Sequence, residues 1–450
     1  MWKRWGADAW LRAAVLIGFT LRVLPLVIWI WKPCVRDECT YVELAEHIMA
    51  GDGMRGTHGW LWAPAYPWLL AIHGWITGYP GTVEGTQLVL ATLSIALVYE
   101  LTHGEFGEGA ARVAAWIYAL NPTLVFYTSS VWSETIYSTL LLGALLSLRH
   151  AREGGPARAL VPGVLVGLCV LFRGVATYSL PIFVLALLWR RWRQRAAWIG
   201  AVLCVAGAVA TVAPYSAWAT QRFGGFVISD RTLGQMMWLG NNDFPPMTFD
   251  YGNGVLTDRD YDRAKAMGRP HCPYTKDPVR QDDCEIENGK AWIAAHPREF
   301  LARVPVRVAQ LLNPHSFLTR HLRWGKWVGT PPWLDEILIA LVVVFSMVTM
   351  IGGTIGWVAR GKGWYGLAAG LILLYHVGAI AVLAGLTRYR VPLEPIWLVF
   401  AAGFLVDARA TLRTLFDGRP RTVAGLVLIV LVVAHVLRYL PVGWPSWRSW

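Results

Sequence analysis

The feature that most constrains this chain is a series of long apolar segments separated by short polar loops. Helical residues rise about 1.5 Å each, so about 20 apolar residues cross the roughly 30 Å hydrocarbon core of a bilayer. Of the 450 residues, 55% are hydrophobic and only 16% are charged, which is typical of a polytopic membrane protein. We count about eleven spans: residues 11–31, 86–101, 110–127, a segment opened by Glu134, 162–172, 181–189, 196–219, 333–358, 364–383, 396–406 and 422–440.

Basic residues gather in loops at alternate ends of these segments. The clusters are Lys3/Arg4/Arg12, Arg149/Arg152/Arg158, Arg190/Arg191/Arg193/Arg195, Arg360/Lys362 and Arg409/Arg413/Arg419/Arg421. Placing them all on the cytoplasmic side satisfies the positive-inside rule, and many of the 26 Trp then fall at segment ends, as in an interfacial aromatic belt. The net charge of +12 therefore indicates topology and not a nucleic-acid partner. We expect a multi-pass protein of the inner (plasma) membrane with a cytoplasmic N-terminus.

This topology divides the chain into three parts. Residues 1–220 form an N-terminal transmembrane module with a first outer loop at 32–85, residues 221–332 form an outer (periplasmic) domain, and residues 333–450 form the C-terminal transmembrane helices. The first segment lacks a small-residue cleavage site, so we interpret it as a retained anchor. The predicted fold class is all-α, with interfacial helices in the first outer loop.

Two adjacent carboxylates, Asp37 and Glu38, lie where the chain leaves the membrane for the first time. The apolar residues from Tyr41 to Met49 recur at helical spacing, with charged residues between them, which predicts an amphipathic interfacial helix. An acidic first turn can simply complement the helix dipole, and this structural reading stays open for both carboxylates.

The other conspicuous polar residues fall on the same predicted side of the membrane. Glu134 opens a helix there, and Arg173 stands between two apolar segments too short to span comfortably, which predicts a broken helix pair lining a polar region. The sequence Arg388-Tyr389-Arg390 follows a later span. Guanidinium groups bind phosphate bidentately, but Arg173 could also snorkel, and the later arginines could bind lipid headgroups in general.

Together these groups indicate transfer from a phosphorylated donor. Carboxylates act as general bases or hold a divalent cation, and arginines bind phosphate. No nucleotide-binding motif is present, so a lipid-phosphate donor reached from the bilayer fits better than ATP. Asn241 and Asn242, near the start of the outer domain, lie on the same face. No Cys/His dyads mark a metal site. The carboxylates leave a divalent cation possible, but its ligands are unknown.

The six cysteines agree with an oxidising outer compartment. Cys34 and Cys39 share the first outer loop, and Cys272 and Cys284 share the large one, whereas the other two lie in apolar segments. Two local pairs confined to the outer side predict disulfides. Reduced thiols or a metal pair are the alternatives.

In the order of its motifs the chain resembles the membrane-integral GT-C glycosyltransferases, and especially glycosyltransferase family 39 with its bacterial relatives. That group includes protein O-mannosyltransferases and the lipid A aminoarabinose and galacturonic acid transferases. The motifs are Asp37-Glu38 followed by Tyr41, Pro64-Ala65-Tyr66-Pro67, Asn121-Pro122, Ser133-Glu134, Phe172-Arg173-Gly174, Gly240-Asn241-Asn242 and Arg388-Tyr389-Arg390. The resemblance covers the first 220 residues and, more loosely, the closing segments. The Pro-Pro pair common in the family is absent, and the outer loop matches no familiar accessory domain.

The resemblance implies an inverting glycosyltransferase that uses a polyprenyl-phosphate sugar and acts on a lipid, glycan or protein hydroxyl at the outer face. Asp37 would be the general base, with Glu38 beside it and Glu134 as a second acidic residue. Candidate ligands of the donor phosphate are Arg173, Arg388, Arg390 and Tyr389, and candidate substrate contacts are Tyr41, His58, Tyr66, Asn241 and Asn242. A lone histidine such as His58 is more often a surface or packing residue than a ligand.

Two other functions fit parts of the pattern. A transporter or flippase of lipid-linked glycans also has broken helices and buried charges, but there they usually lie near the midplane with symmetry between halves. An O-antigen polymerase or ligase also uses outer-loop arginines, but lacks the early Asp-Glu loop. We therefore prefer the glycosyltransferase.

Overall fold

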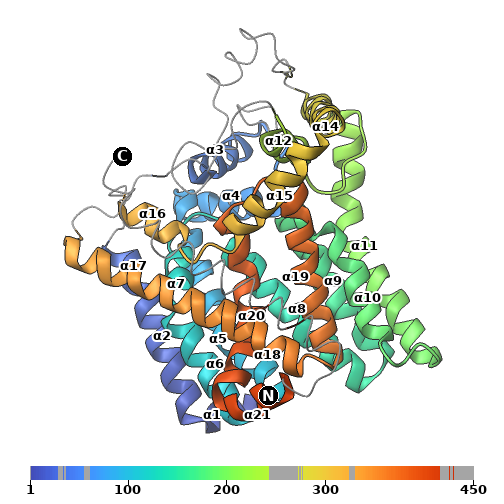
Figure 1. Ribbon diagram of the computed structural model, residues 1–450. Helices are drawn as coiled ribbons and strands as arrows, with labels where there is room; N and C mark the ends of the chain where they lie inside the picture. The colour runs from blue at the N-terminus through green and yellow to red at the C-terminus, as the bar shows by residue number, and fades with distance from the viewer. Residues whose placement is uncertain are drawn as a thin grey trace.

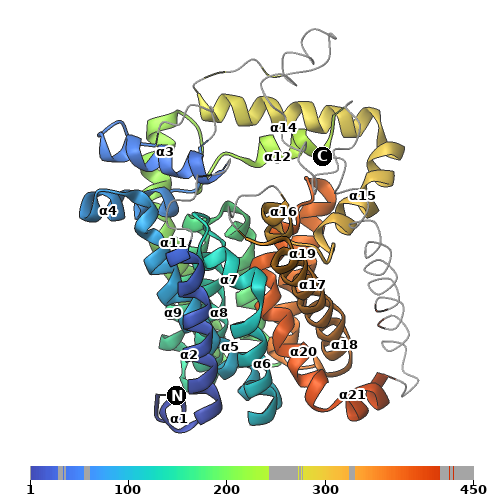
Figure 2. The ribbon, with the colours of Figure 1, turned by 90° about the vertical axis from the view of Figure 1, so that its left-hand side faces the viewer.

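The described residues of the computed structural model are 2–28, 34, 37–54, 61–242, 272, 275, 277–323, 330–415, 425 and 429. Within these residues the fold is helical, and the only strand-like pairing is a single antiparallel bridge between Leu61 and Arg231. Long helices form an upright bundle, and shorter helices lie across one of its ends (Figures 1 and 2). The expected all-α polytopic fold is confirmed.

Six helical stretches of the described chain are long and apolar enough to cross a membrane. They are α2 (Ala9–Ile28), η1 with α5 (Pro80–Phe106), α11 (Arg195–Phe223), α17 to α18 (Pro332–Arg360), α19 (Trp364–Val382) and η6 with α20 (Thr387–Val406). The bundle also contains α6 (Glu108–Leu120), α8 (Glu134–Gly154), α9 (Leu160–Phe172) and α10 (Leu180–Leu188). The count of about eleven spans remains a prediction, because most of the segment at 422–440 lies outside the described residues.

Small residues let neighbouring helices of the bundle approach closely. A β-carbon at Gly163 of α9 would lie 2.1 Å from the carbonyl oxygen of Cys204 in α11, and one at Gly207 of α11 would lie 2.7 Å from the carbonyl oxygen of Leu160. In membranes such close backbone packing replaces the hydrophobic drive that water supplies. The α9–α11 pair is therefore a rigid support for the residues that follow α9.

Two breaks interrupt the helices of the bundle, and the one at Arg173 was predicted from the sequence. The first comes at Asn121-Pro122, where α6 ends and the short α7 (Pro122–Thr128) begins, with the Asn121 side chain accepting from the Thr123 amide at 2.9 Å. The second comes at Arg173, where α9 ends and a 3₁₀ turn, η3 (Gly174–Ser179), leads into α10.

A buried arginine that the sequence did not single out supports the first break. Proline has no amide hydrogen, so a break at Pro122 leaves carbonyl groups at the end of α6 without helical partners. Arg22 of α2 donates to the carbonyl oxygens of Tyr118 and Ala119, both at 3.1 Å, and is fully buried. Arg22 thus supplies hydrogen-bond donors to carbonyl groups that the helix break leaves without helical partners.

The helices across one end form a separate layer. It contains α3 (Asp37–Met49), α4 (Ala65–Thr77), α12 (Leu233–Gly240), α14 (Pro278–Ala295) and α15 (Pro297–Leu311), while α1 (Trp2–Ala7) and α21 (Ala408–Leu415) lie at the opposite end (Figures 1 and 2). As expected for an amphipathic helix, α3 buries Tyr41, Leu44, Ala45 and Ile48. The basic helices α1, before α2, and α21, after α20, thus lie at the end of the bundle opposite α3.

The segment predicted as an outer domain contains two successive helices in its second half. The first of them, α14, begins at Pro278, where the Asp277 side chain caps it, and ends before His296. A new helix, α15, starts at Pro297, because proline is favoured in a first turn but cannot continue the preceding helix. The mostly polar sequence of α14 hid this helix.

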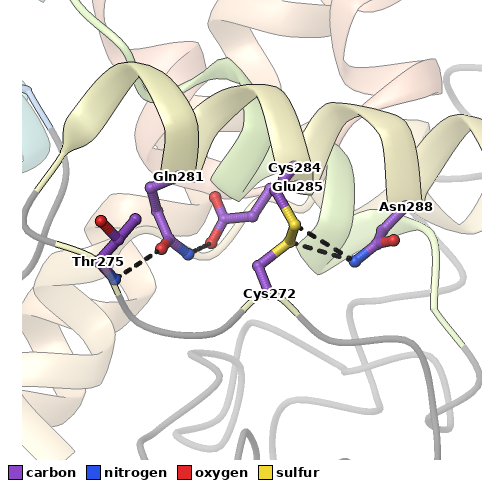
Figure 3. The surroundings of a disulfide bond; sticks show 6 residues. All are labelled: Cys272, Thr275, Gln281, Cys284, Glu285 and Asn288. Atoms are coloured by element: carbon purple, nitrogen blue, oxygen red, sulfur yellow. Dashed lines mark hydrogen bonds between the residues drawn. A yellow bond between two sulfur atoms is a disulfide. The ribbon is translucent and has the colours of Figure 1, made fainter.

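Both predicted cysteine pairs are bonded in the structure. Cys34 pairs with Cys39 at the start of α3, and Cys272 pairs with Cys284 of α14. Figure 3 shows the second disulfide beside Asn288, whose side-chain amide lies 3.2 Å from the Cys272 sulfur, and beside Gln281, which donates to Glu285 at 2.9 Å. The disulfide joins the chain before α14 to the helix itself.

Candidate functional site

Four distant parts of the chain bring charged side chains together at one end of the bundle. Asp37 begins α3, Glu134 begins α8, Arg173 follows α9, and Arg388 lies in the 3₁₀ turn η6 (Thr387–Leu393). Arg388 binds Asp37 through Nη1 and Glu134 through Nε, and the Arg173 Nη1 atom lies 2.7 Å from Glu134 Oε1. Two carboxylates and two guanidinium groups therefore form one charge-balanced cluster.

Exposure distinguishes the members of the cluster. The Asp37 side chain is 39% exposed, whereas Arg388 is 7% exposed and Glu134 is completely buried. Glu134 Oε1 accepts from both arginines, while its Oε2 has no hydrogen-bond partner among the described residues. Glu134 thus fixes the two arginines, and Asp37 is the carboxylate that an incoming molecule can reach.

Aromatic and hydroxyl groups shape the surroundings of the arginines. The Arg388 guanidinium lies over the Trp132 ring at 4.7 Å from its centroid, and Arg173 donates to Ser133 Oγ at 3.2 Å. Arg173 also lies 5.8 Å from the ring centroid of Tyr389. Sequence reasoning gave no role to Trp132 or Ser133, although both immediately precede Glu134 at the start of α8.

Glu38 lies next to Asp37 but has a different environment. Its side chain is buried, and its Oε1 accepts from the backbone N–H of Val131 at 3.1 Å. Consecutive residues of a helix point about 100° apart, so only one of the two carboxylates can face the cluster. Glu38 therefore connects α3 to the loop that carries Glu134.

Two of the tyrosines expected at the site, Tyr41 and Tyr66, pack against each other. Tyr41 is buried, with its ring 4.8 Å from that of Tyr66 and 5.1 Å from that of Trp62, and burial raises the pKa of Tyr41. The Tyr66 hydroxyl donates to Gln87 at 2.9 Å, and Gln87 in turn donates to the Ser130 carbonyl at 2.8 Å. These contacts link the first outer loop to the segment before Glu134.

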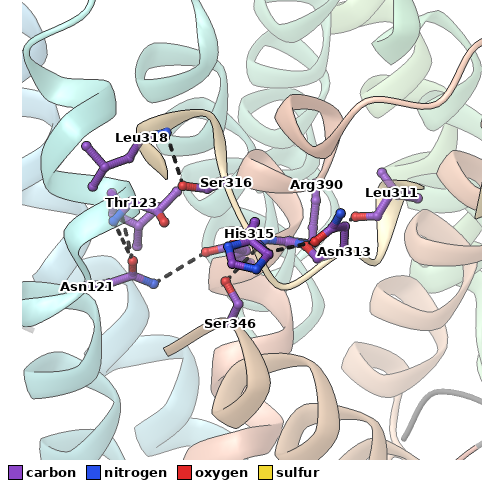
Figure 4. A network of polar contacts seen from close by, with 11 residues as sticks. Asn121, Thr123, Leu311, Asn313, His315, Ser316, Leu318, Ser346 and Arg390 are labelled. Atoms are coloured by element: carbon purple, nitrogen blue, oxygen red, sulfur yellow. Dashed lines mark hydrogen bonds and ion pairs between the residues drawn. The ribbon is translucent and has the colours of Figure 1, made fainter. Parts of the chain in front are cut away.

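Arg390 does not join the cluster, although only one residue separates it from Arg388. Its Nε atom lies 3.0 Å from the Glu394 carboxylate, and its remaining nitrogens donate to Ser346 Oγ at 3.2 Å and to the carbonyl oxygens of Leu311 and Asn313 (Figure 4). The side chain is fully buried. We therefore leave Arg390 out of the phosphate site that we propose below, because its donors already hold the fold.

The two asparagines also serve as internal ties in this structure. Asn241 donates to the Val382 carbonyl at 2.9 Å and accepts from Arg307 at 2.9 Å, which connects the end of α12 to the end of α19. Asn242 donates to the Trp238 carbonyl at 2.9 Å within its own turn. Neither contacts the Asp37 cluster, and His58 lies outside the described residues.

The described residues can be compared with the usual arrangement of metal ligands. Among the described residues no three His, Cys, Asp or Glu side chains converge. The two acidic residues of the cluster, Asp37 and Glu134, are bridged by Arg388, so a cation already lies between them. The possible divalent cation remains a prediction, and no step proposed below depends on one.

Comparisons with known proteins agree with this architecture. Residues 62–218 match the family model described as dolichyl-phosphate-mannose-protein mannosyltransferase. YycA of Bacillus subtilis (strain 168), a protein named as a mannosyltransferase, is 32% identical over 120 residues, which are 26% of this chain and 16% of YycA.

The fold is similar to that of solved membrane enzymes. The apo oligosaccharyltransferase of Archaeoglobus fulgidus superposes with a TM-score of 0.51 at 15% identity, covering 97% of this chain and 56% of that one. The same enzyme, AglB, in complex with an inhibitory peptide and a dolichol-phosphate gives 0.50 at 15% identity, covering 98% and 56%. This chain therefore spans about half the length of these structures and a much smaller share of YycA.

Fold and site thus define a polytopic helical membrane protein with an acidic and basic cluster at one end of its bundle. Residues 62–218 match a mannosyltransferase family model, and the fold is similar to that of an oligosaccharyltransferase, in agreement with the resemblance of the motifs to GT-C glycosyltransferases.

Proposed function

We propose that this protein is an inverting glycosyltransferase that moves a sugar from a polyprenyl-phosphate donor to a hydroxyl group of a lipid, glycan or protein. One observation carries the proposal: the partly exposed Asp37 carboxylate lies in the same cluster as the guanidinium groups of Arg388, which is buried, and Arg173, which is 13% exposed. A base for the acceptor and cations for the leaving phosphate are the two requirements of this reaction.

The reaction needs no oxidant or nucleotide. Asp37 takes the proton of the acceptor hydroxyl as the acceptor oxygen bonds to the anomeric carbon of the sugar. The bond between that carbon and the phosphate oxygen breaks, and its electron pair stays on the phosphate. Arg388 and Arg173 then stabilise the negative charge that develops on the polyprenyl phosphate, because guanidinium groups bind phosphate oxygens bidentately.

Arg388 connects donor binding to the base. In the structure it binds Asp37, which an acceptor hydroxyl must approach. The phosphodiester of the donor, like a carboxylate, carries one negative charge and two free oxygens, so it can compete with Asp37 for the Arg388 Nη atoms. Binding of the donor phosphate to Arg388 then frees Asp37 to act as a base. Glu134 continues to hold Arg388 through Nε.

The donor class and the membrane side rest on two lines of support. The description of the matching family model names a dolichyl-phosphate sugar, dolichyl-phosphate-mannose, and the structure of AglB has been solved in complex with a dolichol-phosphate. The basic α1 and α21 lie at the end of the bundle opposite α3 (Figure 2). By the positive-inside rule this orientation supports our proposal that Asp37 lies at the outer face of the inner membrane.

A transfer assay tests the proposal. Purified protein in liposomes is given a panel of radiolabelled polyprenyl-phosphate sugars together with envelope lipids, glycans and proteins. We expect wild type to transfer label from at least one donor and Asp37→Asn to lose about 10²-fold or more of that activity, since it removes the base without changing shape. Glu43→Gln, an equivalent change on the same helix outside the cluster, should behave as wild type.

Two outcomes would contradict the proposal. Wild type could consume no donor in the panel, or Asp37→Asn could transfer as fast as wild type. Either result would make flipping of a lipid-linked glycan the function to test next, with fluorescent lipid-linked glycans in the same liposomes.

A further inference from the structure

The segment between α11 and α12 contacts the turn that carries Arg173. Within this segment, which we define as residues 224–232, the Asp230 carboxylate lies directly on Gly174. A β-carbon at Gly174 would be 2.0 Å from Asp230 Oδ1, and the Gly174 amide lies close enough to the carboxylate to lower the pKa of Asp230. The Thr232 hydroxyl donates to Asp230 Oδ2 at 3.0 Å. Asp230 therefore holds the residue next to Arg173.

The segment has its own supports, independent of that turn. The backbone N–H of Arg231 donates to the carbonyl oxygen of Leu61 at 2.7 Å, which ties it to the first outer loop. The Arg231 Nη1 atom lies 3.3 Å from Asp282 of α14, and Asp282 also accepts from the Gly234 amide. With the Cys272–Cys284 disulfide bracing α14, the position of Asp230 is set from outside the bundle.

The opposite side of the turn is held by the bundle. The Tyr375 hydroxyl of α19 donates to the carbonyl oxygen of Val175 at 2.7 Å, and the Arg173 amide completes the last turn of α9 by donating to Cys169 at 2.9 Å. The Arg173 carbonyl accepts from the Ala176 amide at 2.9 Å, and Gly174 meets Asp230 on the other side of the turn. We expect that a loss of the contact between Gly174 and Asp230 loosens the turn and weakens the placement of the Arg173 guanidinium against Glu134.

We propose that ionised Asp230 is a positioning residue that holds Gly174 and thereby sets the Arg173 guanidinium for the donor phosphate. This inference rests on the proposed function. Asp230 touches neither the donor nor the acceptor; it acts through the turn.

The charge of Asp230 changes near neutral pH. Burial raises the pKa of Asp230 to about 6, the charge of Asp282 adds to the rise, and the Thr232 hydroxyl, the Gly174 amide and Arg173 oppose it. Tyr215 of α11 and Tyr375 of α19 also face Asp230, but a phenol ordinarily titrates near pH 10, so both are neutral in this range. Below about pH 6 the carboxyl is neutral and holds the Gly174 amide more weakly.

Binding of labelled polyprenyl phosphate between pH 5 and 8 tests this role. Wild type should lose affinity as the pH falls through about 6. Asp230→Asn should bind about tenfold more weakly at pH 7.5, the worth of one charge-assisted hydrogen bond, and should lack the wild-type transition. Glu287→Gln, an exposed acidic position on α14, is the matched control. The phosphate group of the ligand titrates in the same way in the assay of each variant. Differences in binding affinity between the variants therefore report on Asp230.

A second variant keeps the inference testable if Asp230→Asn does not fold. Thr232→Ala removes a hydrogen bond to the ionised carboxylate, so it should raise the pKa of Asp230 and move the binding transition to higher pH. An unmoved transition in Thr232→Ala, or wild-type affinity at every pH in Asp230→Asn, would overturn the positioning role alone. If wild type bound no polyprenyl phosphate at any pH, the proposed function itself would fail.

Discussion

At the residue scale, two adjacent carboxylates have different environments. Asp37 faces the arginines and is 39% exposed, whereas Glu38 is buried and accepts from the Val131 amide. We predict that Glu38→Gln keeps transfer within a few-fold of wild type, because the Gln side chain still offers an oxygen to the same amide. Parallel transfer assays of Glu38→Gln and Asp37→Asn measure the contrast. Equal losses in the two variants would show that the pair acts as a unit.

Arg388 is the residue on which the geometry of the cluster depends most. Lysine keeps the positive charge but cannot bind Asp37 and Glu134 through separate nitrogens of one planar group. We predict that Arg388→Lys raises the donor KM about tenfold or more, since it loses at least one charge-assisted hydrogen bond. Steady-state kinetics with the identified donor measures this effect. Arg12→Lys, an exposed arginine of α2, is the control, and an unchanged donor KM in Arg388→Lys would remove Arg388 from the phosphate site.

The sequence predicted which charged residues lie at one face of the membrane, but it did not predict which of Arg388 and Arg390 joins the cluster. Asp37, Glu134, Arg173 and Arg388 were all expected on one face, because each follows or opens an apolar segment. Arg390 was expected to share the role of Arg388. Residues two apart in a 3₁₀ turn point about 240° apart, and only the packing of η6 decides that Arg390 faces Glu394 while Arg388 faces Glu134.

At the element scale, the helix breaks place the charged residues. The break after α6 could be predicted from Asn121-Pro122, but its partner Arg22 could not, because 97 residues separate Arg22 from the Ala119 carbonyl that it binds. Likewise, nothing in the sequence around Asp230 indicates that it contacts Gly174. Such contacts depend on which helices become neighbours, and local patterns carry no record of that.

We predict that Arg22→Leu destabilises the protein. The change leaves the carbonyl groups of Tyr118 and Ala119 buried without a donor, and each such group costs about 1–3 kcal/mol. The measurement is the apparent midpoint of thermal unfolding in detergent, with Arg12→Gln on the same helix as the control. If Arg22→Leu unfolded at the wild-type temperature, the break between α6 and α7 would not need this arginine.

At the scale of the whole molecule, α3, which begins with Asp37, lies at one end and the basic helices α1 and α21 lie at the other (Figure 1). The overall fold class followed from composition and segment length alone. The helices of the outer segment did not, because α14 is too polar to show an apolar period and its position depends on contacts with α12.

Sidedness can be measured by cysteine labelling in intact cells. The native thiols give little background, since Cys169 and Cys204 are buried and the other four cysteines are paired. We predict that a membrane-impermeant maleimide labels Ala50→Cys, at the end of α3, but labels Ala157→Cys, between α8 and α9, only after permeabilisation. The reverse pattern would put the cluster on the cytoplasmic side.

The most direct test of the central claim compares binding and turnover in one preparation of Asp37→Asn. If Asp37 is the base and the arginines bind the leaving phosphate, this variant should bind labelled polyprenyl phosphate at least as tightly as wild type, because Arg388 no longer pairs with a carboxylate at position 37. It should nevertheless transfer no sugar above background. Normal transfer, or a loss of binding that matches the loss of transfer, would contradict the division of roles between Asp37 and the two arginines.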